Sequence, residues 1–89
     1  MRRRTKLRIL ADILRTLEVG EANVTKLMLE ANLSYVRLSR YLDELEANGL
    51  VMKIEEGREV KYRITARGRE FLREFNRMLQ IAEAFGIEL

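Results

Sequence analysis

The sequence contains no cysteine, no histidine and no proline. The lack of cysteine excludes disulfides and thiolate metal sites, and the lack of histidine removes the most frequent general base and metal ligand. The five glycines form no phosphate-binding loop, and no apolar run approaches the roughly 18 residues that span a bilayer. We therefore expect neither an enzyme nor a membrane protein, and no cofactor, metal or small-molecule ligand.

Positive charge is concentrated at the N-terminus. The net charge is +3, but the first eight residues alone carry +5 without an acid, so the rest of the chain sums to −2. These five cations are Arg2, Arg3, Arg4, Lys6 and Arg8. A basic arm of this kind is typical of contact with a nucleic-acid backbone. Arg2, Arg3 and Arg4 are therefore candidate DNA contacts, and the alternative is a solubilising end of the chain.

The first half of the chain has helical spacing. Leucines three and four residues apart predict a first helix over residues 5–18. They are Leu7, Leu10, Leu14 and Leu17. A short second helix is expected over residues 24–31, and a third begins at Ser34, a good N-cap, and ends at Gly49. Asn32 tolerates the left-handed conformation that a tight turn between the second and third helices needs.

After Gly49 the apolar period changes from 3.6 to 2, which predicts two β-strands. The alternating apolar residues are Leu50, Met52 and Ile54 in the first strand and Val60, Tyr62 and Ile64 in the second. Gly57 lies between the strands, where a hairpin turn favours glycine. We therefore expect a two-stranded hairpin whose apolar residues share one face.

A long final helix follows, capped by Thr65. Its apolar residues show the 4-3-4-3 spacing of a coiled-coil seam. About twenty helical residues extend about 30 Å, further than a domain this small covers, so the distal half needs another surface. We predict that a second copy of the chain supplies this surface, with packing inside the chain's own domain as the alternative. The predicted dimer interface comprises Phe71, Phe75, Met78, Leu79, Ala82 and Phe85.

The order helix, helix, helix, hairpin, helix predicts a mainly α fold with a β-hairpin, a winged helix-turn-helix. Residues 31–42 resemble the turn and recognition helix of winged-helix regulators, and residues 45–51 resemble their junction with the wing. Together with the Thr-x-x-Gly that opens the last helix, they resemble the small archaeal winged-helix DNA-binding proteins of the Sso-ten-a type. The resemblance covers nearly the whole chain. It implies a homodimer joined by an antiparallel coiled coil of the last helices.

This organisation divides the chain into a winged-helix domain with its basic arm, residues 1–65, and a dimerisation helix, residues 66–89. A recognition helix presents its N-terminal turns to DNA bases and phosphates. The residues of those turns are Ser34, Tyr35, Val36, Arg37, Ser39 and Arg40. Arg40 is the first candidate, because a guanidinium grips a phosphate or reads guanine with two hydrogen bonds. The alternative for the arginines is ordinary helix-surface charge.

On the predicted wing, Arg58 and Lys61 are the candidate backbone contacts, against the alternative of a solvated hairpin. The hypothesis is a double-stranded DNA-binding protein, either an architectural chromatin protein or a transcription regulator, expected in the cytoplasm with the nucleoid. Two alternatives stay open. One is a protein-interaction module that uses exposed Val36 and Val51, and the other is RNA binding through the same basic surface.

Overall fold

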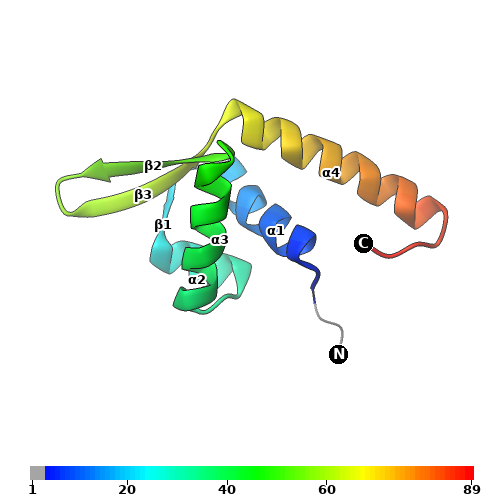
Figure 1. Cartoon of the computed structure of the whole chain (residues 1–89), viewed down its shortest axis with the longest axis horizontal. Helices are drawn as coiled ribbons and strands as arrows, with labels where there is room; N and C mark the ends of the chain where they lie inside the picture. The colour runs from blue at the N-terminus through cyan, green and yellow to red at the C-terminus, as the bar shows by residue number, and fades with distance from the viewer. Residues whose placement is uncertain (1–3) are drawn as a thin grey trace.

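Four helices and a small antiparallel sheet make up the computed structural model, which describes residues 4–89 (Figure 1). In chain order the elements are α1 (Lys6–Val19), β1 (Ala22–Asn23), α2 (Val24–Ala31), α3 (Tyr35–Ala47), β2 (Val51–Glu56), β3 (Glu59–Ile64) and α4 (Ala66–Ala84). The predicted winged helix-turn-helix fold is confirmed. The wing, which is the hairpin of β2 and β3, projects from one end of the molecule and α4 from the other (Figure 1).

Side-chain caps set the starts of the helices, as the sequence predicts. The Ser34 hydroxyl accepts a hydrogen bond from the Arg37 amide at 3.3 Å and so begins α3. The Thr65 hydroxyl accepts from the Gly68 amide at 3.0 Å and begins α4. Each cap satisfies one of the amide donors that the first helical turn leaves unpaired. Asn32, with φ 54°, makes the left-handed turn between α2 and α3.

The sheet has three strands in the order β1-β3-β2, whereas the sequence predicted two. The added strand is β1, in which Ala22 pairs with Tyr62 and Asn23 with Lys61. Two residues are too few to show a period-2 pattern, so no alternation announces this strand. Because β1 leads directly into α2, the pairing joins the wing to the helix-turn-helix.

The predicted single apolar face of the hairpin is wrong for β2. Val51 pairs with Ile64 and Lys53 with Tyr62, so Val51 and Lys53 share the inner face with the buried residues of β3. Met52, which pairs with Arg63, lies on the opposite face and is 51% exposed. Val51 is buried instead. The buried and exposed residues of β2 therefore alternate one residue out of the predicted phase. A shift of one residue moves every side chain of a strand to the opposite face of the sheet.

The core is centred on α1. Its residues Ile13, Leu14 and Leu17 are fully buried, and the helix packs against α2, β3 and α4. Leu38, Leu42 and Leu45 close the core from α3, as the sequence predicts. Because α3 gives the core only this one stripe, the rest of its surface is free to carry polar and charged side chains.

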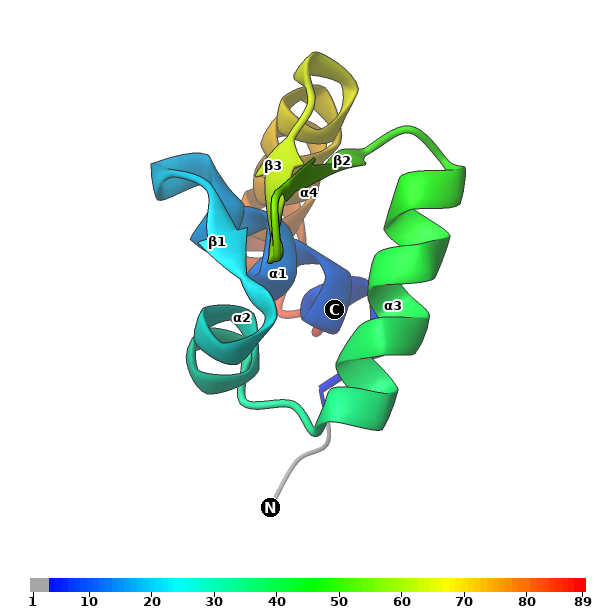
Figure 2. The ribbon, with the colours of Figure 1, turned by 90° about the vertical axis from the view of Figure 1, so that its left-hand side faces the viewer.

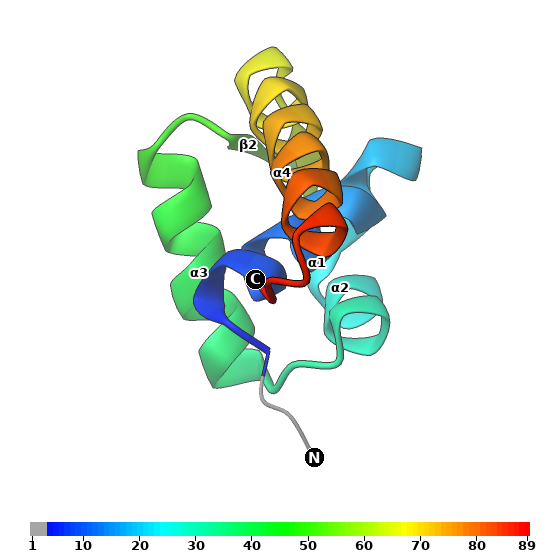
Figure 3. The same cartoon turned by 90° about the vertical axis from the view of Figure 1, so that its right-hand side faces the viewer.

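Helix α4 packs against α1, and the residues beyond α4 turn back toward α1 (Figure 3). The Ile87 amide donates to the Ala82 carbonyl at 2.7 Å, and Leu89 is half-buried against the core. This return covers the distal turns, and Ala82 is buried within its own chain. The expectation that the distal half of this helix lies beyond the reach of its own domain is therefore wrong for Ala82.

Candidate nucleic-acid interface

The N-terminal half of α3 presents the predicted recognition residues on one open surface. Tyr35 and Val36 are 60% and 69% exposed, and Arg37 and Arg40 are also exposed. In contrast, Ser39 is half-buried. Figure 2 shows α2 and α3 joined by a short turn, with the sheet above them. The structure thus brings together the side chains that the sequence assigned to this helix.

The two arginines of this surface have free charges within the part of the chain that the structure describes. Neither Arg37 nor Arg40 forms a salt bridge with another residue of 4–89. Further along α3, Glu44 is paired with Lys6 at 2.6 Å, while Asp43 stays exposed. The first turns of α3 are therefore positive, and the helix dipole adds to this at the N-terminus.

The wing contributes one free cation at its tip. Arg58 follows Gly57 in the turn, is exposed, and has no salt bridge to the described residues. Lys61 is half-buried and lies 3.7 Å from Glu59, so its charge is partly compensated. Arg58 is thus better placed than Lys61 to reach a phosphate. Exposed Met52 on the outer face of the wing is a residue that the sequence did not single out, because its phase in β2 was misread.

Arg4 is occupied inside the chain. Its guanidinium donates to the Asp12 carboxylate at 2.8 Å and to the Asn32 carbonyl at 3.1 Å. It therefore ties α1 to the turn between α2 and α3, and Asp12 compensates its charge. Of the three arginines assigned to the arm, Arg2 and Arg3 lie outside the described residues. Arg4 acts as a support for the recognition helix in this arrangement and not as a free cation.

Tyr62 lies where the wing approaches the second half of α3. Burial raises the pKa of its hydroxyl above the usual 10.0. Lys53, directly across on β2, works against this shift, while Glu46, Asp43 and Tyr35 of α3 add to it. The inner side of the wing therefore meets the acidic half of α3. This leaves the first turns of α3 as the positive part of this surface, since exposed Glu56 offsets Arg58 at the wing tip.

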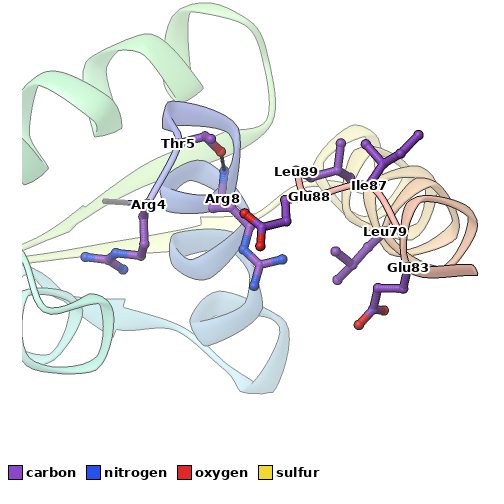
Figure 4. Close-up of a pocket in the computed structure, with 8 residues that line it drawn as sticks. All are labelled: Arg4, Thr5, Arg8, Leu79, Glu83, Ile87, Glu88 and Leu89. Carbon is purple, nitrogen blue, oxygen red and sulfur yellow. Dashed lines mark hydrogen bonds between the residues drawn. The ribbon is translucent and has the colours of Figure 1, made fainter. Parts of the chain in front are cut away.

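A groove opens between the start of α1 and the end of the chain (Figure 4). Arg8 and Leu79 stand on its two walls, Ile87 and Leu89 close one side, and the Arg4 side chain points away from it. Its lining mixes apolar and oppositely charged groups.

Among residues 4–89, no group of three or more histidine, cysteine or acidic side chains is placed to hold a metal ion. None of the described helices is long and apolar enough to cross a membrane.

The predicted dimer interface divides into buried and exposed residues. Phe75 and Ala82 are buried within the chain, and Phe71 and Leu79 are half-buried against its core. Met78 is 51% exposed and Phe85 76%. The sequence missed one further exposed residue, Ile81, which is 51% exposed. Ile81 lies three residues after Met78 and four before Phe85. This helical spacing of apolar residues is the pattern by which the sequence could have identified it.

A family model described as winged helix-turn-helix matches residues 3–83. The chain belongs to the winged helix-turn-helix family. The match begins in the basic arm and ends in the last turn of α4, so it includes both the recognition helix and the wing. The family assignment and the arrangement of α2, α3 and the hairpin agree.

Archaeal proteins are among the relatives of this winged-helix chain. An uncharacterized protein of Methanocaldococcus jannaschii is 28% identical over 79 residues, covering 89% of this chain and 77% of that protein. The crystal structure of Sso10a-2, a DNA-binding protein from Sulfolobus solfataricus, matches with a TM-score of 0.85 at 28% identity, over 92% of this chain and 85% of that one. The transcriptional regulator BldR from the same organism matches with a TM-score of 0.79 at 26% identity, over 89% of this chain but 60% of its own. The resemblance to the Sso-ten-a type is confirmed.

Proposed function

We propose that this winged-helix protein binds double-stranded DNA, with the N-terminal turns of α3 in the major groove and the wing tip against the backbone. The observation that carries the proposal is the exposure of Arg37 and Arg40 at the start of α3, both without a salt bridge in residues 4–89. Arg40 lies on the face opposite the core stripe, and Arg37 flanks that stripe. Sso10a-2 is described as a DNA-binding protein and BldR as a transcriptional regulator, which supports the same role here.

The residues at the start of α3 suit contacts to phosphates better than contacts to base edges. The exposed side chains at the start of α3 include two arginines, Arg37 and Arg40, and exposed Asp43 on the next turn repels phosphate. Contacts to phosphate position a protein but carry no sequence information. We therefore propose binding that tolerates many sequences, as an architectural DNA-binding protein needs. A regulator of few promoters is the alternative, and duplexes of unrelated sequence that differ widely in affinity would favour it.

We further propose that the protein acts as a homodimer through α4. Met78, Ile81 and Phe85 form an exposed apolar strip along one side of this helix. Phe71, two turns before Met78, continues the strip into a groove of about 560 Å³. The apolar floor of that groove also contains Leu10, Leu45 and Leu50. A second copy of α4 running antiparallel would cover the strip and place its own Phe85 near this groove.

The interaction-module alternative, which used exposed apolar residues including Val36 and Val51, is weakened by the burial of Val51. Val36 alone, surrounded by two free arginines, suits a thymine methyl in a major groove better than an apolar protein partner.

The test replaces both arginines of the recognition surface. We expect Arg37→Ala with Arg40→Ala to weaken binding to every duplex by about tenfold or more. The plot of log affinity against log salt should flatten by about one unit for each phosphate that the variant no longer neutralises. Affinity is measured by fluorescence anisotropy between 50 and 300 mM salt, conditions chosen to resolve the slope about the physiological range.

Two controls separate charge from folding. Arg37→Lys with Arg40→Lys keeps the charge and should restore most of the affinity and the slope, since lysine also contacts phosphates. Arg67→Ala removes an exposed arginine of α4 and should leave binding unchanged. Full affinity in the double alanine variant, with the same salt slope as the wild type, shows that α3 is not the DNA surface.

A further inference from the structure

A second basic surface lies on the back of α4, away from the apolar strip and from the core. Arg69, Arg73 and Arg77 follow one another at intervals of four residues along the helix. Arg15 of α1 stands beside them and donates to the Asn76 side chain at 3.5 Å. These four arginines, defined here as the α4 arginine surface, are all exposed.

The α4 arginine surface carries an excess of positive charge. Arg77 is paired with Glu74 at 3.3 Å, and Arg15 with Asp12 at 2.9 Å. Asp12 is shared with Arg4, so it compensates less than one full charge at Arg15. Within residues 4–89, Arg69 and Arg73 have no salt bridge at all. Two of the four guanidinium groups thus have no compensating partner in the described chain.

The surface encloses a depression of about 470 Å³. Its described lining is Glu18, Arg69, Arg73, Asn76, Arg77 and Gln80. No apolar residue belongs to this lining and only one carboxylate does, which disfavours an apolar peptide or small molecule. Arginine guanidinium and side-chain amide groups are the donors that proteins direct at the phosphates of DNA.

The spacing of the row also fits a nucleic-acid backbone. At 1.5 Å per residue, arginines four residues apart follow each other at about 6 Å, and the row extends about 12 Å. A DNA strand carries one phosphate per about 3.4 Å of helix axis and also winds around that axis, so neighbouring phosphates of one strand lie further apart than this rise, at a spacing close to that of the row. The long, flexible arginine side chains accommodate the remaining difference between the two spacings.

The position of the α4 arginine surface relative to α3 indicates which ligand it binds. Figures 2 and 3 show α3 on one side of α1 and the C-terminal end of α1, next to α4, on the other. Glu18, at that end of α1, lines the depression. The α4 arginine surface and α3 therefore lie on different sides of α1. We propose that this surface binds the phosphate backbone of a second DNA duplex, so that the protein links two duplexes.

The second site leaves the proposed dimer contact free. At 100° per residue, the centre of the arginine row is about a third of a turn away from the strip formed by Met78, Ile81 and Phe85. A partner on that strip would leave both copies of the α4 arginine surface open. The inference builds on the proposed function in one respect, since α3 holds the first duplex, and its test separates the two sites.

The test compares three proteins with duplex DNA: the wild type, the α3 variant (Arg37→Ala with Arg40→Ala) and the α4 variant (Arg69→Gln, Arg73→Gln and Arg77→Gln). Glutamine keeps the helix and much of the side-chain length but removes the charge. The first measurement is binding to one labelled duplex. The second is capture of a labelled duplex by protein already bound to an immobilised duplex. A lysine triple variant at the same three positions is the matched control, and circular dichroism verifies the fold of each protein.

We expect the α4 variant to bind a single duplex within about twofold of the wild type and to capture the second duplex several-fold less, while the lysine variant captures it normally. Since a dimer carries two copies of α3, the residual binding of the α3 variant is the decisive comparison. That residual binding should be salt-sensitive and should disappear when the α4 substitutions are added.

The outcomes for the two sites are distinct. If the α4 substitutions change neither the capture nor the residual binding, the arginine row is only a solvated face and the inference is wrong. If the α3 variant loses all binding, the second site does not hold DNA, and the inference fails while the proposed function stands. If the α3 variant binds as the wild type does and the α4 variant does not bind, the proposed function fails and the inference stands.

Discussion

Gly68 marks the closest approach between α4 and the chain that leads into the wing. A Cβ atom at this position would lie 2.1 Å from the Leu50 carbonyl oxygen and 2.8 Å from Cγ1 of Ile64. The Leu50 carbonyl also accepts a hydrogen bond from the Thr65 amide at 3.1 Å, so it is held in place. Only glycine lets α4 start here, which explains the Thr-x-x-Gly pattern at this junction in physical terms.

We therefore expect Gly68→Ala to destabilise the protein. Alanine is favoured in helices by about 1 kcal/mol over glycine, but overpacking against the backbone costs typically about 1–3 kcal/mol, and here the clashing atom is a fixed carbonyl. The net change should be a loss of unfolding free energy, measured by urea titration. Gly20→Ala is the control, since no atom of the described chain lies within 4 Å of its added Cβ. Equal stability of Gly68→Ala and the wild type would contradict the close packing.

Tyr62 gives the protein a pH dependence in alkali. Its raised pKa means that the unfolded chain, with a pKa near 10.0, loses the hydroxyl proton before the folded chain does. The stability linked to this proton is complete below pH 10 and is lost as the pH rises through the higher folded pKa. Tyr62→Phe should remove that decline, and thermal melts from pH 8 to pH 11 measure it. Tyr41→Phe removes a tyrosine hydroxyl that does not act on Tyr62, so it serves as the control and should decline like the wild type.

At the scale of elements, the sequence predicts the helices and strands that have a clear apolar period. All four helices and both hairpin strands follow from the sequence, because leucine spacing and caps such as Ser34 and Thr65 act locally. Strand β1 was not, since its two residues become a strand only through pairing with β3, which is distant in sequence. The phase of β2 was misread for a related reason. Apolar residues stand on both of its faces, and packing against the core selects Val51 over Met52.

The candidate site was foreseen to a similar degree. The outward residues of α3 follow from helix geometry, and the structure places Arg37 and Arg40 where the sequence put them. The occupation of Arg4 by Asp12 and Asn32 did not follow, because it depends on how α1 sits against the turn between α2 and α3. Local pattern thus predicts which side chains point outward, while tertiary packing decides which of the charged ones stay free.

At the scale of the molecule, three surfaces point in different directions. The start of α3 carries unpaired cations, the back of α4 carries the arginine row, and the side of α4 carries the apolar strip. A net charge of only +3 is therefore compatible with nucleic-acid binding, because the cations gather on two surfaces and acids beside them such as Glu44 and Glu74 are paired. The distribution of charge, more than its sum, sets the field that a duplex meets.

The apolar strip is the surface on which the assembly depends. Ile81→Glu places a charge in its centre without touching the core, so the helical content should be unchanged while the dimer dissociates, as sedimentation analysis would measure. Two linked recognition helices gain affinity through effective concentration, so the monomer should bind long duplexes more weakly by on the order of 100-fold. Ala84→Glu adds the same charge at an exposed position outside the strip and should leave the dimer intact. If the wild type sediments as a monomer at DNA-binding concentrations, the homodimer is wrong, and another partner must cover Met78, Ile81 and Phe85.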